Sequence, residues 1–130
     1  MEMDHRDRPP RVLVIEDSNV IRRLIEVCLR PLGVEVSLVA NGPAGLESAA
    51  IDRPNLVLLD IGLPGMDGWQ VLETLRSSGA MYPILMLTGH GEQWSERRAV
   101  GQGANGFMTK PFLPDALRAR ISRHIHQIPA

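Results

Sequence analysis

The stretch LVLLDIGLPGMDGW, residues 56–69, decides the fold of this chain. Four consecutive apolar residues run into one acid, Asp60, and glycine or proline then occupies four of the next eight positions. A short, continuously apolar run bounded by turn residues is typical of a strand buried on both faces of a sheet. An acid at the end of such a strand lies at the edge of a rigid sheet beneath a loop, which favours a reactive group over a structural one.

The residues on both sides of this stretch repeat the pattern of an apolar strand followed by a helix, five times in all. The expected strands are residues 12–16, 34–39, 56–59, 83–87 and 106–108. The first expected helix has Ser18 as its N-cap and stops at Pro31, and the second begins at about Pro43. The third ends near Gly79, the fourth covers residues 92–100, and the fifth runs from Pro114 through Ile128. The apolar set of the first helix is Ile21, Leu24, Ile25, Cys28 and Leu29. Strands that alternate with helices predict an α/β fold with a doubly wound parallel sheet and helices on both faces.

The composition of the strands also predicts their order. The strands that begin at Val12, Leu56 and Ile84 are continuously apolar, as central strands should be, whereas residues 34–39 alternate and indicate an edge strand. A five-stranded order of 2-1-3-4-5, the flavodoxin-like arrangement, satisfies these patterns. Sheets with this order bind ligands outside the carboxyl ends of the strands, where the first and third strands meet.

The composition suits one compact domain, which we expect at residues 11–127, between a disordered tail at 1–10 and a short tail at 128–130. The net charge of −1 and the lack of a basic block argue against direct binding of nucleic acid. No apolar run is long enough to span a membrane. The charged start and the single cysteine, Cys28, which we expect to be a small buried side chain, fit a cytoplasmic protein.

Three carboxylates fall at the carboxyl ends of the first and third strands: Glu16, Asp17 and Asp60. One acid after a strand often only caps the next helix, but three in one crevice need another explanation. Two carboxylates about 5 Å apart repel by roughly 3 kcal/mol at an effective dielectric constant near 20. A bound cation or a raised pKa relieves such repulsion. Because the expected ligands are all oxygens, with no paired histidine or cysteine nearby, the pattern predicts Mg²⁺ rather than zinc.

Two further polar residues end strands at the same edge: Thr88 after PILML and Lys110 after GFMT. A lysine by itself is usually a solvated surface residue. A hydroxyl and an ammonium beside a metal-bound carboxylate, however, form a site for a tetrahedral anion, because the cations neutralise phosphoryl oxygens and the hydroxyl donates a hydrogen bond.

These motifs resemble the receiver domain of two-component response regulators. They are VIED, which includes Glu16 and Asp17, LLDIGLPGMDG with Asp60, LTG with Thr88, and KPF with Lys110. The resemblance covers about residues 11–127, and four motifs in the same order make it specific.

The resemblance implies a phosphoprotein of a phosphorelay. Asp60 would accept the phosphoryl group of a phosphohistidine on a sensor histidine kinase or a histidine phosphotransfer protein. Asp17 would coordinate Mg²⁺ directly, Glu16 directly or through water, and Asp60 and the backbone carbonyl of Gly62 would complete the protein ligands. Lys110 would pair with the phosphoryl group. The chemistry would be limited to self-phosphorylation and autodephosphorylation, so the chain is expected not to be an enzyme with a turned-over substrate.

The expected output is a movement of Thr88 toward the phosphoryl group, coupled to Phe107, which matches the family's switch aromatic. From the sequence alone, Phe107 could also be only a core residue of an edge strand. The face formed by the fourth helix, fifth strand and fifth helix would then bind an unidentified downstream protein, as a monomer or a phosphorylation-dependent dimer. The fourth helix carries one large apolar residue, Trp94, and is expected to be weakly held. Its residues Arg97 and Arg98 are expected to be solvated.

Two positions depart from the common pattern of the family and are expected to set the lifetime of the acyl phosphate. Gly62, two residues after the acceptor, leaves the phosphoryl group open to water. His90, two residues after Thr88, overhangs the same pocket, although it could also be only an exposed histidine of the loop.

Three alternatives stay open from the sequence. The chain could be a receiver domain excised from a larger regulator or hybrid kinase. An aspartyl-phosphate phosphohydrolase also uses an acid at a strand end, but needs a second acid where this chain has Gly62. A flavin-binding protein of the same fold class would need a phosphate-binding loop after the first strand, where this chain has the acidic EDSNV, residues 16–20.

Overall fold

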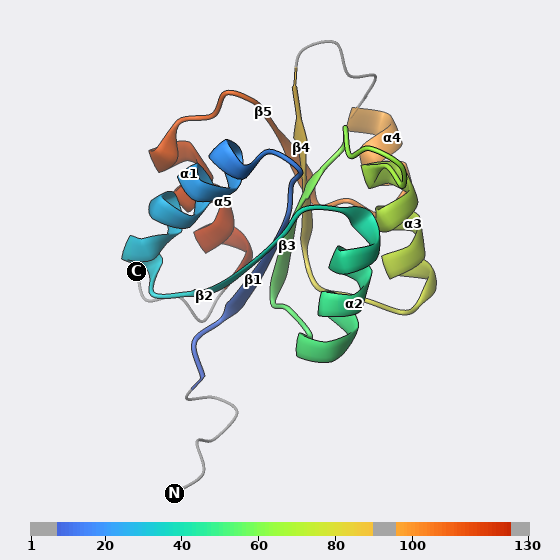
Figure 1. Cartoon of the computed structure of the whole chain (residues 1–130), viewed down its shortest axis with the longest axis horizontal. Coiled ribbons are helices and arrows are strands. Elements are labelled where there is room, and N and C mark those ends of the chain that lie inside the picture. Colours follow the sequence, from blue (N-terminus) through green and yellow to red (C-terminus); the bar gives the residue numbers. More distant parts are fainter. Residues whose placement is uncertain (1–7, 90–95, 126–130) are drawn as a thin grey trace, which may run out of the picture.

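The computed structural model describes residues 8–89 and 96–125 and contains one parallel sheet. Its strand order, β2-β1-β3-β4-β5, is the predicted one (Figure 1). The strands are β1 (Arg11–Ile15), β2 (Glu35–Val39), β3 (Leu56–Asp60), β4 (Ile84–Thr88) and β5 (Gly106–Thr109).

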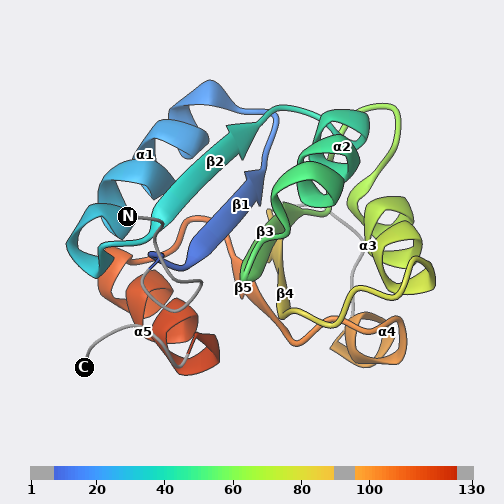
Figure 2. The ribbon, with the colours of Figure 1, turned by 90° about the horizontal axis from the view of Figure 1, so that it is seen from below.

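Five α-helices cover the two faces of the sheet, so the predicted doubly wound α/β class is confirmed. They are α1 (Asn19–Leu29), α2 (Gly42–Asp52), α3 (Gly68–Ser77), α4 (Glu96–Gly101) and α5 (Pro114–His124), and a short 3₁₀ turn, η2 (Arg30–Leu32), follows α1. Figure 2 shows α1 and α5 on one face and α2, α3 and α4 on the other. None of the helices within the described residues is both long enough and apolar enough to cross a bilayer.

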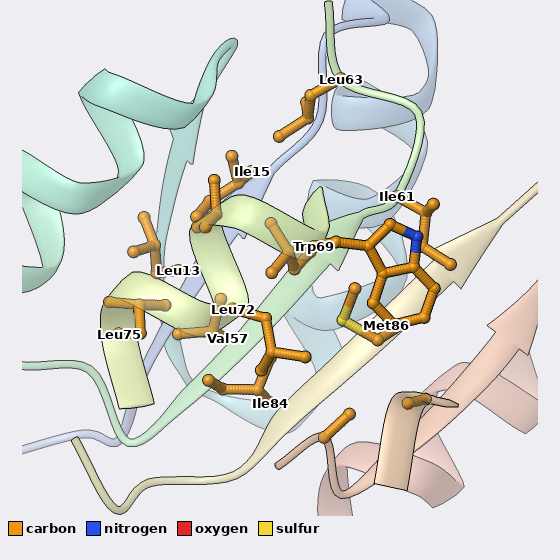
Figure 3. Packing of buried hydrophobic residues seen from close by; sticks show 14 of the residues in the cluster. Leu13, Ile15, Val57, Ile61, Leu63, Trp69, Leu72, Leu75, Ile84 and Met86 are labelled. Atoms are coloured by element: carbon orange, nitrogen blue, oxygen red, sulfur yellow. The ribbon is translucent and has the colours of Figure 1, made fainter. Parts of the chain in front are cut away.

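Each face of the sheet has its own apolar core because successive side chains of a strand point to opposite faces. Leu13 and Val57 pack toward α2 and α3, together with Trp69 and Leu72 (Figure 3). The strand residues next to Leu13 and Val57 point to the other face and pack against α1 and α5. All residues of β3 and β4 are buried, whereas β2 is only partly buried, as expected for central and edge strands.

Side-chain caps fix where three helices begin, and therefore where the loops at the carboxyl edge of the sheet end. Ser18 accepts a hydrogen bond from the Ile21 amide at 3.3 Å, and Asn41 accepts one from the Ala44 amide at 2.8 Å. At the start of α3, Asp67 and Gln70 form a reciprocal capping box.

Three sequence expectations are wrong in detail. Pro10, assigned to a disordered tail at residues 1–10, is buried, and its carbonyl accepts a hydrogen bond from the Glu35 amide at 2.8 Å. Leu24, expected in the apolar set of α1, is 44% exposed. The last helix ends at His124, because Ile125 has an extended backbone; Ile128 lies outside the described residues.

The fourth helix is described only from Glu96 onward. The expected residues 92–95 of this helix, which include Trp94, lie outside the described residues, as does His90. Cys28 is buried, as predicted.

Candidate functional site

Three carboxylates meet at the carboxyl edge of the sheet, as the sequence predicts. β1 and β3 are neighbours, and Ile15 of β1 pairs with Leu59 of β3, so Glu16, which follows β1, and Asp60, the last residue of β3, lie at the same level. One carboxylate oxygen from each of Glu16, Asp17 and Asp60 lies within 4.8 Å of the others. Glu16 and Asp60 are buried, whereas Asp17 is exposed.

The backbone around Asp60 depends on a close approach by Gly68. A Cβ atom on this glycine would lie 2.3 Å from the carbonyl oxygen of Asp60, which is too close for any other residue. The Gly68 amide donates to the Ile61 carbonyl at 3.0 Å and closes the loop between β3 and α3. Within that loop, the Gly62 amide donates to Asp60 Oδ1 at 3.1 Å. The loop therefore both holds the acid and leaves Gly62 exposed above it.

Lys110 joins the two buried acids. Its Nζ lies 2.9 Å from Glu16 Oε1 and 3.1 Å from Asp60 Oδ1, and the second oxygen of Glu16 accepts a hydrogen bond from the Ser18 amide at 3.0 Å. The sequence contains thirteen arginines and this single lysine. The predicted lysine is therefore part of the site and not a solvated surface residue.

The pKa values of the three acids and of Lys110 are shifted by burial and by the interactions of these groups with one another. Burial, together with the neighbouring charge of Asp60, raises the pKa of Glu16 to about 7, although hydrogen bonds from Ser18 and Lys110 oppose the rise. Burial also raises the pKa of Asp60, against the opposing charge of Lys110. For Asp17, slight burial acts to raise the pKa, but hydrogen bonds with Glu16 and Asp60 outweigh it and lower the pKa. Burial acts to lower the pKa of Lys110, but its bonds to the two acids raise it overall.

The donor set fits Mg²⁺. Three carboxylates contribute oxygen atoms to one region, and the group contains no histidine or cysteine. Burial raises the pKa of both buried acids in spite of the opposing interactions with Lys110, whose ammonium contacts them both. A divalent cation would supply the missing charge.

Thr88 ends β4 at the same edge of the sheet and is buried. β3 and β4 pair Asp60 with Leu87, so Thr88 lies one residue beyond the level of the acid. Its carbonyl accepts the Lys110 amide at 2.7 Å, which ties the end of β4 to the lysine.

The other predicted residues lie around this centre. Phe107 lies on β5, is partly buried, and packs against the core beneath α3 and α4. Gly62 lies exposed in the loop after Asp60, and His90 lies outside the described residues. The parts that these three residues play stay predictions.

Two arginines make contacts that the sequence does not predict. Arg22 Nη1 donates to the carbonyl oxygens of Glu16 at 2.7 Å and of Asp17 at 3.0 Å. Arg98 is exposed, as expected of a solvated face, but its guanidinium also lies 4.1 Å from the ring centroid of Trp69, a stacking contact that the sequence does not predict. The spacing of residues in the sequence predicts neither contact, because each contact depends on the conformation of a long arginine side chain.

An apolar hollow of about 310 Å³ opens beside Lys110. Its lining residues are Ile21, Leu24, Gly89, Lys110, Pro111 and Phe112. A larger cleft of about 600 Å³ lies between α2 and α3 and includes Arg53 and Tyr82, at the opposite end of the strands from the acids. The acid cluster is therefore next to the smaller hollow.

The chain is similar to curated proteins that control transcription and the cell cycle. It is 36% identical to the alkaline phosphatase synthesis transcriptional regulatory protein PhoP of Bacillus subtilis, and 40% identical to the cell cycle response regulator CtrA of Brucella ovis. Each match covers 85% of this chain but 46% and 48% of the relative, so the chain spans about half the length of these proteins.

Solved structures have the same fold. The chemotaxis protein CheY4 of Vibrio cholerae matches with a TM-score of 0.83 and 29% identity, over 90% of this chain and 99% of that one. A response regulator from Chloroflexus aurantiacus, described as putative, matches with a TM-score of 0.82 and 30% identity, over 89% and 97%. Residues 12–122 match the response regulator receiver domain, and the chain therefore belongs to that family.

Proposed function

We propose that Asp60 accepts a phosphoryl group from a phosphohistidine of a sensor histidine kinase or a histidine phosphotransfer protein, in a reaction that depends on Mg²⁺. The observation that carries this proposal is the position of Lys110, whose ammonium contacts both buried acids at the edge of the sheet. An acid that is buried, paired with a cation and close to two further carboxylates is suited to receive an anionic group once the charge is neutralised.

The chemical step forms one bond and breaks one. A carboxylate oxygen of Asp60 attacks phosphorus, the bond from phosphorus to the imidazole nitrogen breaks, and that nitrogen keeps the electron pair. Glu16, Asp17, Asp60 and the Gly62 carbonyl would hold Mg²⁺, which supplies positive charge for the carboxylates and the phosphoryl oxygens.

The residues beside Asp60 then stabilise the product. Lys110 exchanges its bond to Asp60 for one to the phosphoryl oxygens, and the Thr88 hydroxyl donates to another. Movement of Thr88 changes the packing of Phe107 and thereby the face formed by α4, β5 and α5. This face binds a downstream protein in the cytoplasm, as a monomer or as a phosphorylation-dependent dimer, and no other substrate is turned over.

The phosphoryl donor would bind along α1. Val20, Leu24 and Val27 recur at a spacing of four and three residues and are 73%, 44% and 46% exposed, which gives α1 an apolar outer face. Leu24 also lines the hollow beside Lys110. A donor helix that covers these side chains would bring its phosphohistidine to the acid cluster. Exposed apolar patches of this kind are typical of protein-binding surfaces.

Acetyl phosphate tests the proposal without a kinase. We expect intact-protein mass spectrometry to show one added phosphoryl group on the wild type with Mg²⁺, and none with a chelator. Asp60→Asn should stay unlabelled, whereas Asp52→Asn, which changes an exposed acid at the end of α2, should be labelled like the wild type. Labelling of Asp60→Asn, or equal labelling with and without Mg²⁺, would contradict the proposal.

A further inference from the structure

Arg22 on α1 binds the backbone that carries two of the three acids. The same guanidinium nitrogen, Nη1, donates to the carbonyl oxygen of Glu16 at 2.7 Å and to that of Asp17 at 3.0 Å. The side chain is half-buried and makes both bonds across the loop between β1 and α1. Two successive carbonyl groups that point to one place repel each other, so a shared charged donor stabilises this arrangement.

These two carbonyls belong to the two peptide groups on either side of the Asp17 α-carbon. Fixing both peptide planes fixes the direction in which the Asp17 side chain leaves the backbone. Glu16 has other restraints, because its carboxylate is bound by Ser18 and Lys110 and its amide by Val39. The Asp17 side chain is exposed, so burial does not hold it in place, and its side-chain hydrogen bonds are with the two other acids of the cluster.

We infer that Arg22 is a positioning residue that orients Asp17 toward the bound cation. This inference rests on the proposed function of the acids as a Mg²⁺ site. Arg22 does not touch the cation or the phosphoryl group; it acts through the backbone of Asp17. Residues that orient metal ligands typically change metal affinity by about 10- to 100-fold when they are removed.

The positive charge of Arg22 and its positioning of Asp17 have opposite effects on Mg²⁺ affinity, which makes the inference testable. A guanidinium near a cation site repels the cation, so loss of charge alone would tighten Mg²⁺ binding. Loss of positioning would weaken it. Arg23 is the matched control, because it is adjacent on α1, carries the same charge and is exposed, with no side-chain hydrogen bond to a described residue.

The experiment is a Mg²⁺ titration of the full chain without any phosphoryl donor, followed by the amide NMR shifts of residues 16–18 and 62. We expect Arg22→Ala to weaken Mg²⁺ binding by about tenfold relative to the wild type, at the lower end of the range for orienting residues. Arg23→Ala should bind equally well or slightly more tightly. Arg22→Lys keeps the charge and one donor group, so its affinity should lie between those of the wild type and Arg22→Ala.

Thermal unfolding without Mg²⁺ separates positioning from a general loss of structure, because a merely structural role would lower stability without changing the affinity of the folded protein. If Arg22→Ala does not fold, the Mg²⁺ affinities of Arg22→Lys and Arg23→Lys are compared instead. Equal affinities of these two variants overturn the inference. Equal affinities for Arg22→Ala and Arg23→Ala, or tighter binding by Arg22→Ala, overturn it as well. A wild type that binds no Mg²⁺ overturns the proposed function and this inference together, whereas Mg²⁺ binding without phosphorylation of Asp60 overturns only the proposed function.

Discussion

The ammonium of Lys110 lies 2.9 Å from a carboxylate oxygen of Glu16, although 94 residues separate the two positions in the chain. The side chain of Glu16 is fully buried and that of Lys110 is 14% exposed. The contact joins the end of β5, at one edge of the sheet, to the end of β1. Removal of one partner from such a pair leaves a buried charge without compensation, which typically costs about 3–5 kcal/mol.

We therefore predict that Lys110→Met destabilises the protein in the absence of Mg²⁺, by about 3 kcal/mol at pH 8. The loss should be smaller at pH 5, because Glu16, whose pKa is raised to about 7, then takes up a proton and loses its charge. Urea unfolding at the two pH values measures the difference. Arg23→Met, which removes an exposed cation, should change stability little at either pH; an equal loss for both variants would contradict the prediction.

The raised pKa of Glu16 predicts that Mg²⁺ binding depends on pH. With a pKa of about 7, Glu16 is mostly protonated at pH 6, and the proton must leave before the carboxylate can bind the cation. We expect the affinity at pH 6 to be about tenfold lower than its limit at high pH, measured by titration of the folded protein. Glu16→Gln should bind more weakly and lose most of the pH dependence.

The same group affects stability without Mg²⁺. Between its ordinary pKa of 4.5 in the unfolded chain and about 7 in the folded protein, the folded state binds more protons. The contribution of Glu16 to stability is therefore present at low pH and is lost as the pH rises through this range. A stabilisation by Mg²⁺ that grows from pH 6 to pH 8 would agree with this sign, and one that shrinks would not.

We predict that the acyl phosphate on Asp60 is short-lived because residue 62 is a glycine. Its amide contacts Asp60 and the residue is exposed, so nothing larger than hydrogen covers the acceptor at this position. Gly62→Met should slow dephosphorylation severalfold because its side chain would exclude water from the phosphoryl group. Loss of phosphoryl label after removal of the donor measures the rate. His90→Ala tests the second residue expected to set the lifetime, and equal rates for the wild type and both variants would reject this role for both positions.

The apolar face of α1 predicts a difference between phosphoryl donors. Val20→Glu places a charge on the most exposed of the three apolar side chains, so transfer from a phosphorylated kinase should slow by about tenfold or more if this surface is central to the interface. Labelling by acetyl phosphate, which needs no docking, should be unchanged. Ile51→Glu, which alters a similarly exposed residue on the other face of the sheet, is the control. Equal slowing with both donors would indicate damage to the acid site itself.

The stacking of Arg98 on Trp69 predicts that α4 is held partly by α3. Arg98→Ala should lower the free energy of unfolding by about 0.5–1 kcal/mol. It should also shift Trp69 emission to longer wavelength, because the indole ring then becomes more exposed. A Trp94→Phe background isolates the signal of Trp69. Arg97→Ala, on the neighbouring exposed arginine, should leave both measurements unchanged.

The fold could be predicted because each strand carries its own signal. The apolar runs of β3 and β4 identify central strands and the alternation in β2 identifies an edge, and the order 2-1-3-4-5 satisfies these patterns. The acids and Lys110 could be found for a related reason: parallel strands end at the same edge, so residues at strand ends gather there whatever their separation in sequence.

The contacts that the sequence did not predict depend on side-chain direction or on local packing. Arg22 and Arg98 look like ordinary solvated residues in the sequence, and only the path of each side chain shows its partner. Leu24 fits the apolar spacing of α1 but faces outward, because Ile25, Cys28 and Leu29 already fill the core beneath that helix. Pro10 belongs to the fold because β2 pairs with its carbonyl, which a charged leading segment does not reveal.

Lys110 is the single lysine of this sequence, so its side chain can serve as a chemical reporter of the site. Acylating reagents react with neutral amines, and the two carboxylates around Nζ keep this amine protonated, so the rate of acylation measures how firmly they hold it. The same reaction would cancel the charge that balances Glu16 and Asp60. Acylation of Lys110 would therefore both report on the two carboxylates and remove the positive charge that balances them.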